Sequence, residues 1–191
     1  MSQKTCKALT LYFSAGGNTR KVAEVIDEKL RELGVESRLE NIDEQPDVDY
    51  FDYQLVFVGA PVYAYLPPEQ VTAFLKACQK KAEVLPAAPE KPGHFAVTFC
   101  TYGGPHSGPR EAVPALKYMG QFFEHAGIRV VDEWAVVGEF HAEKRKPMNI
   151  AGRLGDITNR PNEADLADIR GRVLGLLRRL KHKLPGIPAD L

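Results

Sequence analysis

Short apolar runs alternate along the chain with longer stretches in which apolar residues recur every three or four positions. The apolar runs predict five strands, at residues 7–13, 35–39, 54–58, 94–100 and 129–137. The helical spacing predicts helices at residues 18–33, 69–80, 109 or 110 to 126, and 163–183. Residues 82–92, rich in proline and alanine, are expected to be a connector.

Strands and helices alternate strictly, which favours a parallel sheet with helices on both faces. The fold class predicted is therefore α/β: a doubly wound, five-stranded parallel sheet in a three-layer sandwich. The chain of 191 residues is long enough for one domain with a full core, so residues 1–191 are expected to form a single domain. In such sheets, ligands bind at the carboxyl ends of the strands.

Composition excludes several classes of protein. The chain is 44% hydrophobic and 26% charged, with a formal net charge of zero, so it is globular and has no basic field for nucleic acid. The three cysteines, Cys6, Cys78 and Cys100, have no metal-binding or CxxC spacing, which favours a reduced, cytoplasmic protein. No apolar run is long enough to cross a membrane, and residues 8–13 are expected to be a strand, not an export signal.

The loop after the first predicted strand has an unusual composition. It consists of Ser14, Ala15, Gly16, Gly17, Asn18 and Thr19. Glycine lets a ligand approach the backbone, and the following helix offers free N–H groups and a partial positive charge, a combination that suits a phosphate. The alternative is an ordinary turn whose helix is capped by Asn18 or Thr19. Neither a Walker loop nor a dinucleotide fingerprint is present.

The loop after the third predicted strand is stiffened by proline and holds two tyrosines. Its central residues are Pro61, Val62, Tyr63, Ala64 and Tyr65. A planar ring could stack on one of the tyrosines. The alternative is that both tyrosines pack against neighbouring helices.

The loop after the fourth predicted strand is rich in glycine. It begins with Thr101, Tyr102, Gly103, Gly104, Pro105 and His106. The glycines would let backbone N–H groups reach the polar edge of a ring, and the alternative for His106 is a solvated loop histidine. Because all three loops are expected at one edge of the sheet, they predict a single site for a phosphorylated planar heterocycle.

On these loops the chain resembles the flavodoxin-like FMN-binding proteins. The family's phosphate loop, Ser/Thr-x-Thr-Gly-x-Thr, is similar to residues 14–19, and residues 50–63 are similar to the family's third strand and ring-binding loop. The resemblance extends over residues 5–137 and the last helix. Gly16 stands where the family usually has threonine, and the chain is neutral where many flavodoxin carriers are acidic.

The resemblance implies FMN as the cofactor and no metal. Residues 14–19 would hold the phosphate, residues 61–65 would flank the ring, and Thr101, Tyr102, Gly103, Gly104 and His106 would meet its pyrimidine edge. His106 would be catalytic, serving the reduced flavin. The glycine-rich third loop looks like that of the flavodoxin-type NAD(P)H:quinone oxidoreductases, so the function expected is reduction of a quinone or similar acceptor.

Two other functions stay open. The protein could be an electron carrier without its own substrate, or a cofactor-free binding domain of the same fold. The expected partners are a redox protein, or NAD(P)H with a small acceptor, and a homodimer is possible. Residues 138–162 are long and polar for a connector, and are expected to form a cap over the flavin, a dimer contact or a solvated loop.

Overall fold

Five parallel strands form one sheet in the computed structural model, which describes residues 5–81, 90–188 and 191. The strands are β1 (Lys7–Tyr12), β2 (Glu36–Asn41), β3 (Leu55–Pro61), β4 (Phe95–Tyr102) and β5 (Arg129–Val137). Their order is β2-β1-β3-β4-β5, the flavodoxin-like order of doubly wound sheets. Most of the connector expected at 82–92 lies outside the described residues.

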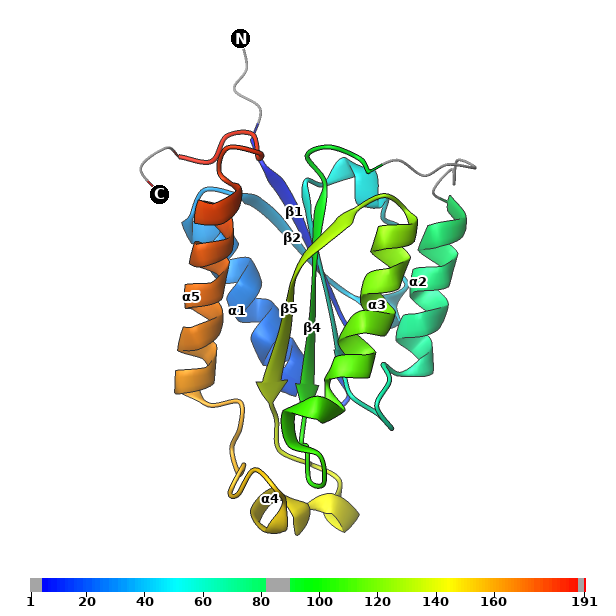
Figure 1. Ribbon diagram of the computed structural model, residues 1–191, viewed down its shortest axis with the longest axis vertical. Coiled ribbons are helices and arrows are strands. Elements are labelled where there is room, and N and C mark those ends of the chain that lie inside the picture. The colour runs from blue at the N-terminus through cyan, green and yellow to red at the C-terminus, as the bar shows by residue number, and fades with distance from the viewer. Residues whose placement is uncertain (1–4, 82–89, 189–190) are drawn as a thin grey trace.

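Helices cover both faces of this sheet, as Figure 1 shows, with α1 and α5 on one face and α2 and α3 on the other. The long helices are α1 (Asn18–Glu32), α2 (Glu69–Lys81), α3 (Val113–His125) and α5 (Glu163–Leu180). The predicted three-layer α/β fold is therefore confirmed.

Alternate residues of the central strands feed two separate cores. In β3, Val56 and Val58 join the core beneath α2 and α3, whereas Leu55 and Phe57 join the core beneath α1 and α5. All four side chains are almost fully buried. Burial on both faces explains why these strands appear in the sequence as continuous apolar runs.

Several predicted boundaries were wrong. Strands β3 and β4 continue to Pro61 and Tyr102, because residues expected in loops pair with neighbouring strands, as Pro61 does with Thr101. The helix expected from 109 or 110 begins only at Val113, after a short 3-10 helix, η3 (Gly108–Glu111). Pro114 has no N–H for a bond to the preceding turn, which separates the two helices.

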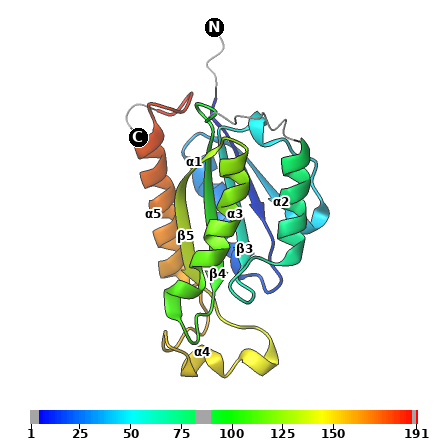
Figure 2. The same cartoon turned by 45° about the vertical axis from the view of Figure 1, so that its right-hand side comes forward.

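Residues 138–162 leave the end of β5 and pass beneath the carboxyl ends of the strands, as Figure 2 shows. They contain the 3-10 helix η4 (Glu143–Arg145) and the short helix α4 (Met148–Ala151). The segment therefore lies where the three unusual loops also end. None of the helices in the described part of the chain is both long and apolar enough to span a membrane.

Candidate functional site

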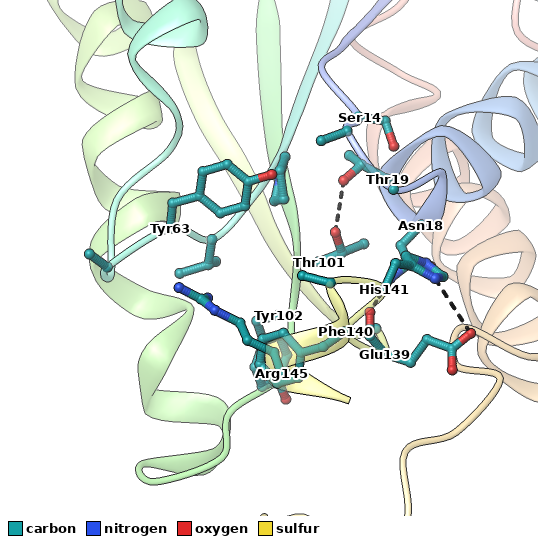
Figure 3. A pocket seen from close by; sticks show the side chains of 18 residues that line it. Ser14, Asn18, Thr19, Tyr63, Thr101, Tyr102, Glu139, Phe140, His141 and Arg145 are labelled. Atoms are coloured by element: carbon teal, nitrogen blue, oxygen red, sulfur yellow. Dashed lines mark hydrogen bonds and ion pairs between the residues drawn. The ribbon is translucent and has the colours of Figure 1, made fainter. Parts of the chain in front are cut away.

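A cavity of about 620 Å³ lies at the carboxyl edge of the sheet. Figure 3 shows Tyr63 and Arg145 on one side of it, and Ser14, Asn18, Thr19 and His141 on the other. Twelve of the sequence-predicted residues line it: Ser14, Ala15, Gly16, Asn18, Thr19, Pro61, Val62, Tyr63, Ala64, Thr101, Tyr102 and Gly103. The structure therefore brings the three predicted loops to one cavity.

The first loop ends in a helix without a side-chain cap. Gly17 occupies the N-cap position with φ of 92°, a left-handed conformation that glycine adopts without strain, and no side chain caps the helix there. The Ser14 hydroxyl accepts a hydrogen bond from the Gly17 N–H at 3.1 Å, which shapes the loop. The first turn of α1 thus presents its backbone N–H groups towards the cavity edge, where an anion is favoured.

Asn18 and Thr19 do not cap α1, so the alternative of an ordinary capped turn is wrong. The Asn18 amide donates to the carbonyl of Glu139 at 2.9 Å, and its oxygen lies 3.0 Å from His141 Nε2. The buried Thr19 hydroxyl lies 2.7 Å from the Thr101 hydroxyl. One of these two hydroxyls donates to the other, which leaves a second hydroxyl hydrogen available to a ligand.

The second loop makes a tight turn after β3. Tyr63 and Leu66 exchange two backbone hydrogen bonds, of 2.8 and 3.0 Å, and Ala64 and Tyr65 between them have φ of 47° and 74°. Two successive non-glycine residues in this region cost of the order of 1–3 kcal/mol each. The turn places Tyr63 on the cavity wall, whereas Tyr65 is 55% exposed and does not line the cavity.

The third loop contributes less of its backbone than expected. Gly104 does not line the cavity, and its N–H donates to the Glu111 carboxylate at 3.3 Å. Gly103 does line the cavity, but a Cβ there would lie 2.2 Å from Phe140 Cζ, so the missing side chain makes room for that ring. The glycine at 103 therefore serves a contact within the chain.

His106 and Gly17 also lie outside the cavity lining. His106 is exposed, and its carbonyl oxygen accepts a bond from Arg153 at 3.4 Å. The catalytic role expected for His106 therefore has no geometric support in this structure.

Six residues of the 138–162 segment line the cavity; a cap was among the alternatives for this segment, but none of its residues was predicted as a site residue. The six are Gly138, Glu139, Phe140, His141, Ala142 and Arg145. His141 lies against the first loop, because a Cβ on Gly16 would be 2.4 Å from its Cδ2 atom. The Arg145 guanidinium lies over the Phe140 ring, 5.8 Å from its centroid. These side chains add an aromatic ring, a carboxylate, an imidazole and a guanidinium.

Hydrogen bonds hold this segment in place. The Gly138 N–H donates to the Tyr102 carbonyl, and the Glu139 N–H donates to the Arg160 carbonyl, both at 2.9 Å. The buried Asn149 side chain accepts from the Phe140 N–H at 2.8 Å and donates to the Phe140 carbonyl at 3.1 Å. Phe140 and His141 are thus presented to the cavity by a fixed backbone.

Two buried groups near the cavity stay neutral at physiological pH. Burial raises the pKa of the Tyr102 hydroxyl and Cys100 adds to this effect, while Arg160 acts in the opposite direction. Burial also raises the pKa of the Cys100 thiol far above its ordinary value. Tyr102 is therefore a neutral phenol, and Cys100 is not a nucleophile.

The arrangement fits one elongated ligand with an anionic end and a planar end. Backbone N–H groups and hydroxyls gather at the first loop, while aromatic side chains gather around Tyr63 and Phe140. The cavity volume of about 620 Å³ falls in the range of small-molecule and cofactor sites.

Comparison with known proteins identifies the class to which this doubly wound fold and edge site belong. A family model described as a flavodoxin domain matches residues 9–138, more than half of the chain. The chain therefore belongs to the flavodoxin domain family. No curated protein sequence matches it.

Several solved structures share the fold. The chain is 18% identical to a flavodoxin from the domain Archaea, with a TM-score of 0.63 over 92% of this chain and 99% of that one. It is 16% identical to flavodoxin 1 from Bacillus cereus, with a TM-score of 0.65 over 91% and 99%. It is 14% identical to a WrbA-like flavodoxin from Agrobacterium tumefaciens, with a TM-score of 0.61 over 94% and 99%. At these identities the likeness is one of fold.

Proposed function

We propose that this protein binds FMN in the cavity at the carboxyl edge and transfers electrons from NAD(P)H or a redox protein to a quinone or similar acceptor. The observation that carries this proposal is the pairing, within one cavity, of an uncapped helix N-terminus with an aromatic wall. Membership of the flavodoxin domain family supports it.

The first loop would hold the phosphate of FMN. Its donors are the backbone N–H groups of the first turn of α1, the Ser14 hydroxyl, and whichever of the Thr19 and Thr101 hydroxyls does not donate to the other. Charge-assisted bonds of this kind are shorter and about twice as strong as bonds between neutral groups. The sequence shows no second glycine-rich fingerprint for an adenine dinucleotide, so a single terminal phosphate is expected at this loop.

Tyr63 and Phe140 are the side chains best placed to contact the flavin ring. Tyr63 is 46% exposed, so a stacked ring would cover apolar surface that now faces solvent. Phe140 packs against Gly103 of the third loop, and the Arg145 guanidinium lies over its ring. The bound flavin supplies the redox chemistry, and these residues orient its ring and shield it from water.

The segment at 138–145 favours a reductase over a carrier. A carrier must bring its flavin edge close to a large protein partner. Here Phe140, His141 and Arg145 form an additional wall over the cavity, which suits a small acceptor approaching a partly enclosed ring. The proposed cap function of this segment follows from the same placement.

The colour and bound cofactor of the purified protein test the first half of the proposal. We expect a yellow protein whose extracted chromophore is FMN by mass spectrometry, or an apo-protein that binds FMN and quenches its fluorescence. A colourless protein that binds neither FMN nor riboflavin would refute flavin binding and favour a cofactor-free domain.

Steady-state kinetics test the second half. The FMN-loaded protein should oxidise NADH or NADPH when a quinone is supplied, and the rate should fall in a Phe140→Ala variant that removes part of the wall. If the loaded protein accepts electrons from a flavodoxin reductase but never from NADH or NADPH with a quinone, it is a carrier.

A further inference from the structure

The contact between His141 and the first loop has a consequence for anion binding. A Cβ on Gly16 would lie 2.4 Å from His141 Cδ2 and 3.4 Å from His141 Nε2. The imidazole therefore occupies the space beside the loop that a side chain at position 16 would need. No lysine or arginine stands among residues 14–19, and Arg20, which follows them, is paired with Glu24, so His141 can supply a positive charge directly beside this loop.

The hydrogen bonds around Asn18 fix the proton on one nitrogen of His141. The Glu139 backbone carbonyl can only accept, so the Asn18 Nδ2 group faces it at 2.9 Å. Asn18 Oδ1 must then accept from His141 Nε2 at 3.0 Å. Nε2 thus carries a proton in either charge state, and Nδ1 is the atom that gains the second proton.

The charged groups around His141 are of both signs. The Glu139 carboxylate lies 3.9 Å from Nδ1, and its side chain is 19% exposed against 41% for His141. Glu139 is itself held by the Asn159 N–H at 3.0 Å. From the other cavity walls come Tyr63, the neutral phenol of Tyr102 and, over Phe140, the cation of Arg145.

We infer that His141 belongs to the phosphate site as a source of charge: in its protonated form it favours the terminal phosphate electrostatically, while its ring nitrogens keep their partners Asn18 and Glu139. The inference rests on the proposed function and deepens it. The protonated imidazole keeps its bond to Asn18 and places a positive charge against the backbone of Gly16. Binding of the phosphate and uptake of the second proton then favour each other to the same degree.

This linkage makes a specific prediction about pH. An imidazole changes charge between about pH 5 and 8, so the advantage from His141 is present at the acid end and lost at the alkaline end. The phosphate's own second ionisation, near pH 6, has the opposite effect on its charge but is the same for every variant. The contribution of His141 therefore appears as a difference between variants.

The experiment measures dissociation constants of FMN and riboflavin for the full-length apo-protein from pH 5.5 to 8.5, using quenching of flavin fluorescence. The ratio of the riboflavin constant to the FMN constant reports the phosphate alone. An opposite charge within about 4–6 Å favours the protonated form of a group by about one pH unit or more. If the phosphate binds within that distance of the imidazole, His141→Gln should lower the ratio about tenfold at pH 5.5. At pH 8.5 the wild type and His141→Gln should agree within about twofold.

Two further variants separate charge from structure. His141→Lys keeps a cation from pH 5.5 to 8.5. Its ratio of riboflavin to FMN dissociation constants should therefore exceed that of His141→Gln by a similar factor at every pH, whereas the excess of wild type over His141→Gln should disappear as the pH rises. His125→Gln is the matched control, since this exposed histidine ends α3 at the opposite edge of the sheet and should behave as wild type. Thermal unfolding of each apo-protein shows that the variants fold.

The outcomes distinguish this inference from the proposed function. If wild type binds FMN but His141→Gln gives the same ratio at every pH, the inference is wrong while the function stands. If His141→Gln weakens FMN and riboflavin equally, His141 supports the loop without favouring the phosphate, and the inference is again wrong. If wild type binds neither flavin, the proposed function itself fails.

Discussion

The packing of the Phe140 ring against Gly103 can be tested by adding a single methyl group at position 103. In Gly103→Ala the new Cβ would lie 2.2, 2.3 and 3.0 Å from three atoms of the Phe140 ring. Carbon atoms in contact are separated by about 3.5–4.0 Å, so the ring must move by more than about 1 Å. Asn149 holds the Phe140 backbone through both its N–H and its carbonyl, so the segment cannot shift freely.

Overpacking of this kind costs about 1–3 kcal/mol of folding free energy. Since 1 kcal/mol lowers the melting temperature by about 2–4 °C in a domain of this size, Gly103→Ala should melt about 2–12 °C below wild type. The assay is urea or thermal unfolding of the apo-protein, followed by circular dichroism, which needs no assumption about the ligand.

A double-mutant cycle identifies the cause. Phe140→Ala removes the ring, so adding Gly103→Ala to it should cost almost nothing further. The coupling free energy between the two positions should then be about 1 kcal/mol or more. Additive effects, with a coupling below about 0.5 kcal/mol, would show that the Gly103 contact does not position Phe140 and would refute this reasoning.

Three further predictions concern the ring wall, the cofactor and the support of the capping segment. Tyr63→Ala should weaken FMN binding by about 1–3 kcal/mol and raise the potential of the second reduction step, because an electron-rich wall disfavours the anionic reduced ring; Tyr65→Ala, outside the cavity, should change neither in a redox titration. FAD should bind more weakly than FMN in fluorescence titrations of the apo-protein, and equal or tighter binding would contradict the single terminal phosphate expected at the first loop. Burial alone would raise the pKa of the Asp165 carboxyl group, but hydrogen bonds from Arg160 and from the Asn162 backbone lower it. The carboxylate therefore stabilises the fold at a pH above its ordinary pKa of about 4, and this stabilisation is lost as the pH falls through the lowered pKa. Asp165→Asn should therefore melt below wild type at pH 7, and the gap should narrow as the pH falls below 4; a gap independent of pH would contradict this account.

The layered fold could be predicted because its cause is local in the sequence. Residues 55–58 are all apolar, as expected of a strand that is covered on both faces. Both faces of β3 are indeed covered. Strand ends were less accurate, since Gly59 and Pro61 have loop-like composition and become strand only by pairing with Tyr12 and Thr101. Pairing across the sheet is not encoded in the residues on either side of a boundary.

The site was predicted where composition marks a loop and missed where it does not. The sequence predicts Gly16 and Gly103 as positions where a ligand approaches the backbone. In the structure Gly16 faces the His141 ring and Gly103 faces the Phe140 ring. Nothing in the local sequence around Phe140 and His141 distinguishes them from a solvated loop. The excess length of residues 138–162 placed a cap among the alternatives for this segment, but it did not indicate which of its residues line the cavity.

The contact between Gly16 and His141 also explains why position 16 departs from the family pattern. A threonine at position 16 would bring its Cβ to 2.4 Å from His141, so the imidazole and a side chain at 16 cannot occupy this space together. The ring must leave, and it then loses its bond to Asn18, which costs about 0.5–1.5 kcal/mol. Gly16→Thr alone should thus displace His141, whereas Gly16→Thr with His141→Gly should restore the loop's usual form. The absence of a side chain at position 16 therefore makes room for the imidazole at position 141. The effect of a substitution at either position depends on the residue at the other.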